Sequence, residues 1–101
     1  MKFVILFEDA PDADPNIRRD HMASHLAFLE SHAGTVEAAG PLTDAAGGGR
    51  DGLWIVEAES EEAVERLVRA DPFWPTGLRQ SYAILPWRQV FAAGQRLVTL
   101  S

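Results

Sequence analysis

The feature that most constrains the fold is a continuous apolar run near the start of the sequence, Phe3 to Phe7. It ends at two acidic residues, and two prolines follow soon afterwards. The run lacks the alternation of a strand that has one face in water, and it is too short to cross a bilayer. It therefore predicts a buried central strand, with both faces covered by other parts of the structure.

Two segments have the pattern of helices. We expect the first helix to span residues 15 or 16 to 32 or 33, because Pro15 suits a first helical turn and Gly34 supplies a stop. Its apolar positions recur at helical spacing: Met22, Leu26 and Leu29. The second helix should begin after Ser60, a favourable capping residue, and end at Asp71, because Pro72 disfavours helical geometry in the residue before it.

Three further strands are expected around these helices, and a fifth strand near the end of the chain. They should occupy residues 35–39, closed by Gly40-Pro41, then 53–59, 81–87 and, after a turn at 92–94, residues 95–100. The order is then β-α-β-β-α-β plus a tail. This is the ferredoxin-like α+β pattern, in which an antiparallel sheet has both helices on one face. We predict a single domain over 1–101, with its core in about 1–91 and a tail strand in 92–101.

The other face of this sheet has no helix to cover it. A monomer rarely leaves so large an apolar surface in water. We therefore expect a homodimer in which two sheets pack face to face, with the tail strand crossing to the partner.

Composition and charge exclude several classes of function. The 101 residues leave room for only one domain, and 15 acidic against 9 basic residues give a formal charge of −6. Because the arginines are scattered in an acidic chain, nucleic acid is not an expected partner. The absence of cysteine excludes disulfides and thiolate sites. No membrane span or signal-peptide cleavage region is recognised, so we expect a cytoplasmic protein.

Five short motifs follow one another along the chain. They are Arg18-Arg19 ahead of His25-Leu26, then Ala39-Gly40-Pro41, Gly52-Leu53 leading to Ser60-Glu61-Glu62-Ala63, Asp71-Pro72-Phe73 followed by Gly77-Leu78, and Leu85-Pro86-Trp87. Over residues 1 to about 91, this set resembles the YciI-like (YCII-related) family. The resemblance implies a dimeric α/β barrel, which is a form of the ferredoxin-like fold.

The resemblance also implies a site. The family places its helix histidine and the aspartate of its Asp-Pro-Phe motif together in a cleft, which here are His25 and Asp71. Most members have no assigned reaction, although a related member dechlorinates a chlorinated hydroxyhydroquinone and muconolactone isomerases share the broader fold. Histidine is a natural proton carrier near neutral pH, and a carboxylate on one ring nitrogen leaves the other for a substrate. The alternative interpretation is a structural histidine–carboxylate pair.

Other residues are candidates for holding a substrate. Phe73 and Trp74 follow Asp71 in a loop and could line a pocket for an aromatic or lactone-like ligand, and Pro41 is included with them. Arg19 or Arg79 could bind a substrate carboxylate through the guanidinium fork, although the simpler expectation is that both are solvated surface residues.

The sequence gives little indication of a metal or cofactor site. His21 and His25 share a helix face at a spacing that can hold a metal, but the glutamate that would stand between them in a zincin is missing. The stretch Gly47-Gly48-Gly49 lacks the Lys and Ser or Thr of a P-loop, which favours a flexible connection over a phosphate site or a mobile lid. We therefore expect no metal and no cofactor.

The resulting hypothesis is a cofactor-independent isomerase or lyase acting on a small organic molecule. His25 would act as acid or base, and Asp71 would orient it. Two alternatives stay open: a non-catalytic dimeric module that binds a small molecule in the same cleft, and a purely structural dimer.

Overall fold

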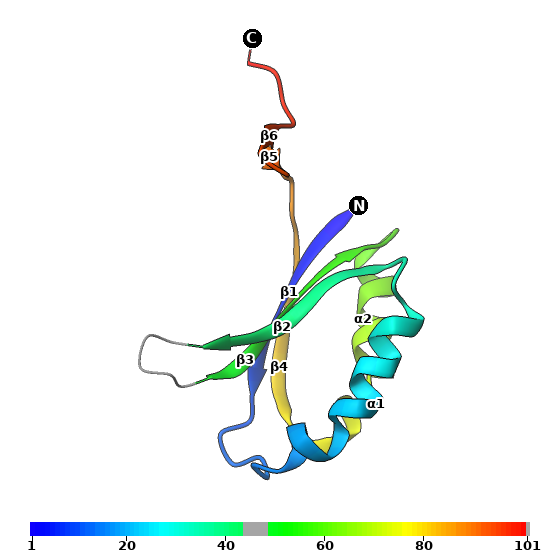
Figure 1. Ribbon diagram of the computed structural model, residues 1–101, viewed down its shortest axis with the longest axis vertical. Helices are drawn as coiled ribbons and strands as arrows, with labels where there is room; N and C mark the ends of the chain where they lie inside the picture. Colours follow the sequence, from blue (N-terminus) through cyan, green and yellow to red (C-terminus); the bar gives the residue numbers. More distant parts are fainter. Residues whose placement is uncertain (44–48, 101) are drawn as a thin grey trace.

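The computed structural model describes residues 1–43 and 49–100. Its body is a curved sheet with two helices beside it, and a tail leads away from the body (Figure 1). The elements are β1 (Lys2–Asp9), α1 (Ile17–Ser31), β2 (Val36–Thr43), β3 (Gly49–Glu57), α2 (Glu61–Ala70), the 3₁₀ turn η1 (Trp74–Thr76), β4 (Arg79–Pro86), β5 (Phe91–Ala92) and β6 (Gln95–Arg96).

The four long strands form one antiparallel sheet in the order β2-β3-β1-β4. Strand β1 is central, as the apolar run predicted, and both helices lie on the same face of the sheet (Figure 1). This confirms the ferredoxin-like α+β fold. The sheet of one chain is open, with β2 and β4 at its edges. The described residues of a single chain form no closed barrel.

The core lies between the sheet and the helices. Alternate residues of β1 point into it, and Phe3, Ile5 and Phe7 are almost fully buried. From β3 and α2 the core receives the buried side chains Trp54, Val56, Val64, Leu67 and Val68. The opposite face differs: Val4 is half-buried and Leu6 is 38% exposed. One chain therefore covers only one of the two faces of β1.

Strands β2 and β3 each extend well past one of their predicted ends. Strand β2 does not stop at Gly40-Pro41 but continues to Thr43, with Pro41 opposite Gly52 of β3. Proline is tolerated there because β2 is an edge strand, where one side of the backbone needs no partner. Strand β3 begins at Gly49 and not at Leu53. Residues 47 and 48 of the glycine stretch lie outside the described residues, so the interpretations of that stretch stay predictions.

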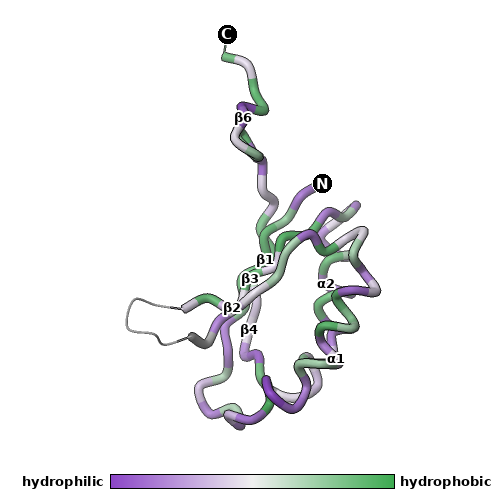
Figure 2. Tube along the Cα trace, in the orientation of Figure 1, coloured by the Kyte–Doolittle hydropathy of each residue, from purple (hydrophilic) through white to green (hydrophobic). Residues whose placement is uncertain are grey.

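The tail differs from the expected single strand over residues 95–100. Only Gln95 and Arg96 are extended, and they pair with Phe91 and Ala92 in a short hairpin. Ala93 and Gly94 form its turn with φ angles of 52° and 77°, the left-handed geometry that tight hairpins require. Hydrophobic stretches recur along this tail, well away from the core (Figure 2). Its exposed apolar residues are Val90, Phe91, Leu97, Val98 and Leu100.

In the described part of the chain, no helix is both long enough and apolar enough to cross a membrane.

Candidate active site

Three elements bring their chemistry-bearing residues to one place. His25 lies in the middle of α1 and is the only residue of that helix with a buried side chain. Asp71 caps the C-terminus of α2 with an extended backbone (φ −63°, ψ 132°), as expected for a residue that precedes proline. Arg79 is the first residue of β4. The helix end and the strand start thus both approach the middle of α1.

The two oxygens of the Asp71 carboxylate accept three hydrogen bonds. Oδ1 lies 2.9 Å from Nδ1 of His25 and accepts from the backbone N–H of Phe73 at 3.1 Å. Oδ2 accepts from Nη1 of Arg79 at 2.8 Å. The side chains of His25, Asp71 and Arg79 are only 10%, 0% and 5% exposed. The predicted contact between His25 and Asp71 is therefore present, and Arg79 extends it to a buried row of three.

The electrostatics of this row favour a charged carboxylate. Burial raises the pKa of Asp71, but the hydrogen bonds from His25 and from the Phe73 N–H, together with the charge of Arg79, outweigh burial and lower it. Burial also lowers the pKa of Arg79, against the opposing effect of Asp71. An arginine remains protonated in proteins despite such a shift. Asp71 and Arg79 consequently form a buried ion pair.

Aromatic rings hold the histidine and the arginine in place. The His25 ring stacks on Phe73 with centroids 4.3 Å apart, and the Trp54 ring lies 6.4 Å from it with the two planes inclined by 26°. The guanidinium carbon of Arg79 lies 3.9 Å from the centroid of the Phe7 ring. These contacts leave both side chains little freedom. Because Nδ1 of His25 is directed at Asp71, its other ring nitrogen, Nε2, is the one available to a ligand.

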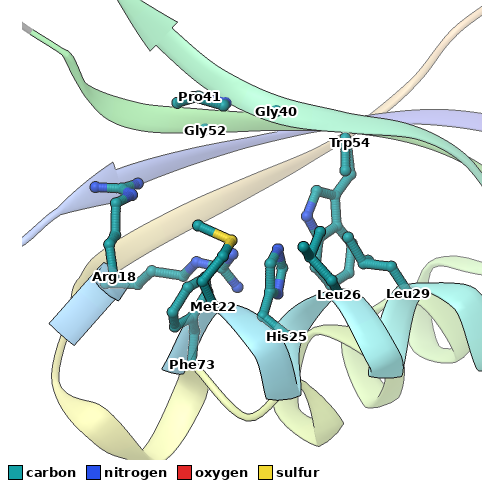
Figure 3. Close-up of a pocket in the computed structure, with 12 residues that line it drawn as sticks. Arg18, Met22, His25, Leu26, Leu29, Gly40, Pro41, Gly52, Trp54 and Phe73 are labelled. Carbon is teal, nitrogen blue, oxygen red and sulfur yellow. The ribbon is translucent and has the colours of Figure 1, made fainter. Parts of the chain in front are cut away.

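A cavity of about 180 Å³ lies between α1 and the β2–β3 half of the sheet. Figure 3 shows Met22, His25, Leu26 and Leu29 projecting from α1 towards the strands that carry Pro41, Gly52 and Trp54. The polar lining residues are Arg18, His25 and Arg79, and the others are apolar or small: Met22, Leu26, Leu29, Ala39, Gly40, Pro41, Gly52, Trp54 and Phe73. This is a mostly apolar pocket with a few convergent polar groups, as is typical of small-molecule sites.

The structure separates the candidate substrate-binding residues into two groups. Phe73 and Pro41 line the cavity. Arg19 is not among the lining residues and forms an exposed ion pair with Asp20. Trp74 also lies elsewhere, with its ring edge-on to Tyr82 at 5.4 Å.

Two arginines line the cavity, of which the sequence suggested Arg79 only as a possible carboxylate binder and did not suggest Arg18 as a site residue. The expectation that Arg79 is a solvated surface residue is wrong, because its side chain is 5% exposed. Nothing in the local sequence signals this, since the burial depends on contacts with distant residues. Arg18 lines the cavity and forms an ion pair with Asp9. Its position could have been predicted, because residues 18, 22, 25 and 29 share one face of a helix.

Within the described ranges, no group of three or more His, Cys, Asp or Glu side chains could hold a metal ion.

Comparison with known proteins identifies the family. The model of the YCII-related domain matches residues 1–88. The chain belongs to this family. Among curated proteins, no sequence matches this chain. The match spans both helices and all four strands of the main sheet, including His25, Asp71 and Arg79.

The solved structure of a similar enzyme agrees with the fold. The 5-chloro-2-hydroxyhydroquinone dehydrochlorinase from Burkholderia phenoliruptrix, solved in complex with 2,5-dihydroxybenzoquinone, is 32% identical to this chain, with a TM-score of 0.72. The match covers 87% of this chain and 94% of that enzyme. A protein from Agrobacterium tumefaciens is 21% identical over 83% of this chain and 88% of its own, with a TM-score of 0.49.

Proposed function

We propose that this YCII-family member is a small-molecule enzyme in which His25 transfers a proton and Asp71 orients the imidazole. The observation that carries the proposal is the position of His25, which lines the 180 Å³ cavity and is hydrogen-bonded through Nδ1 to a buried carboxylate. A carboxylate on Nδ1 favours the tautomer whose lone pair is on Nε2, which suits a general base. The similarity to a dehydrochlorinase supports the assignment.

The substrate class follows from the size and the lining of the cavity. An engineered cavity of about 150 Å³ in another protein accommodates benzene, so about 180 Å³ suits one substituted six-membered ring. The apolar walls match the faces of such a ring, and the guanidinium of Arg18 matches an oxyanion on its edge. A planar oxygenated ring fits this description, and 2,5-dihydroxybenzoquinone, the ligand of the related dehydrochlorinase, is such a compound.

The proposed step is an elimination that needs no oxidant or reductant. Nε2 of His25 removes a proton from the substrate, and the electrons of the broken bond form a new double bond. The leaving group, chloride in a chlorinated ring, departs with its bonding pair. The imidazolium then releases its proton to water, so one HX leaves in total. In an isomerisation the same proton would return to the substrate at another atom.

The decisive experiment is a turnover assay on a panel of chlorinated hydroxyhydroquinones and ring lactones. Chloride release and ultraviolet spectra would be followed for the native protein, His25→Ala and the control His21→Ala. His21 lies one turn away on α1 and does not line the cavity. We expect His25→Ala to lower kcat/KM by about 10²- to 10⁴-fold, and His21→Ala to behave like the native protein. Full activity of His25→Ala would disprove the mechanism.

The same panel separates the enzyme from the non-catalytic alternative. If compounds perturb the ring signals of His25 in NMR spectra but none is converted, the cavity is a binding site without turnover. If no compound perturbs them, the structural interpretation is favoured.

We propose further that a second copy of the chain covers the open face of the sheet. The register places Val4 beside Ile55 and Leu85, and Leu6 beside Leu53 and Ala83, on the side away from the helices. A two-fold axis would pair this face with itself, so that one apolar surface supplies both sides of the interface. The apolar tail, which leaves the body beyond β4, would then contact the partner.

A further inference from the structure

We propose that Arg79 sets the charge of the buried row so that His25 rests as a neutral base. In this assignment Arg79 is a positioning residue that acts through Asp71. The inference rests on the proposed function for the use of the base, but its physical basis is the geometry of the three side chains, which can be tested without a substrate.

The three side chains form a charged group in a place that water hardly reaches. Asp71 is fully buried, and Arg79 and His25 are almost so. With Arg79 protonated and Asp71 ionised, the row has no net charge when the imidazole is neutral. Protonation of His25 would leave one uncompensated positive charge in the interior, which is costly. Without Arg79 the balance reverses, because Asp71 would then need the imidazolium as its only counter-charge.

The hydrogen bonds of the Asp71 carboxylate are consistent with this charge balance. Oδ2 of Asp71 accepts from Arg79, while Oδ1 accepts from Phe73 and faces Nδ1 of His25. An ionised carboxylate has only acceptors, so Nδ1 must carry the hydrogen of this contact. In the neutral imidazole the lone pair is therefore on Nε2. Arg79 thus balances the charge of the row, and the ionised Asp71 beside it sets the tautomer of the neutral His25 ring.

An arginine suits position 79 because aromatic rings surround its guanidinium. The guanidinium lies 3.9 Å from the centroid of Phe7 and 5.4 and 5.5 Å from those of Trp54 and Phe73. A planar cation stacks on such rings while it donates to a carboxylate, which a lysine ammonium does less well. The rings prevent Arg79 from turning towards solvent, so its charge stays beside Asp71.

Other charged or titratable groups near His25 also contribute to the electrostatic potential at its ring. Arg18 of α1 lines the same cavity and bridges to Asp9 of β1, and Asp51 of β3 also acts on Arg18. His21 lies one turn earlier on α1. None of these is changed in the variants below, so their contribution is constant.

The test is an NMR titration of the His25 ring in the ligand-free protein. In Arg79→Met we expect the midpoint of the titration to rise by about one pH unit or more, a tenfold change in the protonation equilibrium. Arg79→Lys keeps the charge and should lie much closer to the native protein. The control is Arg69→Met on α2, whose side chain is 56% exposed, and it should leave the midpoint unchanged. A folded Arg79→Met with the native midpoint would overturn the proposal.

A second pair of variants guards against loss of folding in Arg79→Met, which leaves the buried Asp71 without its cation. Neither Asp71→Asn nor the double variant Asp71→Asn/Arg79→Met contains a buried carboxylate. Asp71→Asn still holds the buried Arg79 cation, so the two variants are compared at a temperature at which circular dichroism shows both to be folded. The proposal requires a higher midpoint in the double variant than in Asp71→Asn, and equal midpoints would refute it. These outcomes do not depend on turnover, so a failure of the proposed enzyme activity would be distinguished from a failure of this inference.

Discussion

At the scale of single residues, Asp71 has two roles in the structure. It ends α2, because Pro72 holds it in an extended conformation, and it gathers donors from α1, from the following loop and from β4. The surrounding donors lower the pKa of a fully buried carboxyl group, although burial by itself raises it. The site and the fold therefore share this residue, and its charge should be visible in the stability of the protein.

Asp71→Asn tests this role in stability. At neutral pH we expect the free energy of unfolding to fall by about 3 kcal/mol or more, because Arg79 keeps a buried charge without its counter-ion. The folded-state pKa of Asp71 is below the ordinary value of 3.8, so its stabilisation is complete above that value and is lost as the pH falls through the folded-state pKa. Urea denaturation from pH 7 into the acid range should show the difference between the two proteins shrinking once the pH falls below 3.8. A difference that does not change with pH would contradict this.

At the scale of elements, the two helices are held by different means. Helix α2 buries Val64, Leu67 and Val68 against the sheet, whereas α1 buries only His25. The apolar residues Met22 and Leu26 of α1 are 36% and 48% exposed and border the cavity. The apolar positions that predicted the buried side of α1 thus line a pocket. A helix with little core contact is suited to a site that must admit a ligand.

The two helices differ in their N-terminal caps, so the same substitution should have different effects in each. Ser60 accepts a hydrogen bond from the backbone N–H of Ala63 at 3.1 Å, whereas Asn16 makes no side-chain cap hydrogen bond to α1. We expect Ser60→Ala to lower the free energy of unfolding by about 1 kcal/mol, and Asn16→Ala to change it much less. Thermal or urea denaturation of the two variants checks this. Equal losses in the free energy of unfolding would show that the cap hydrogen bond of Ser60 does not stabilise α2.

At the scale of the whole molecule, the main feature is the sheet face away from the helices, which exposes apolar side chains to solvent. Leu6 and Leu85 lie on it and are 38% and 45% exposed. The helices lie on the other face, so no other element of the described chain covers these residues (Figure 1). A second copy that covered them would also close the two sheets into the barrel that the resemblance implies.

The predicted dimer can be tested with charges placed on this face. In sedimentation experiments we expect the native protein to have twice the mass of the chain and Leu6→Lys to dissociate to monomers, since an unpaired buried ammonium is costly. The control is Ala23→Lys on the exposed side of α1, which should remain dimeric. A native protein that sediments as a monomer at micromolar concentration would rule out the proposed interface.

The sequence by itself determined the elements whose signals are local. The apolar run predicted the central position of β1, Ser60 and Pro72 marked the two ends of α2, and the order of elements indicated the ferredoxin-like sheet. Family motifs singled out His25 and Asp71, and the structure places them in contact. The predictions of the elements succeeded because hydrophobic periodicity, capping and proline geometry act over a few residues.

Only the tertiary structure decided the composition of the site. Arg79 looks like any surface arginine until α2, β4 and β1 bring Asp71 and Phe7 to it. Arg18 lines the cavity and its neighbour Arg19 does not, because of the side of α1 that faces the sheet. Strand β2 continues through Gly40-Pro41 because it is an edge strand. Each of these outcomes depends on contacts between residues far apart in the chain, and no local pattern contains that information.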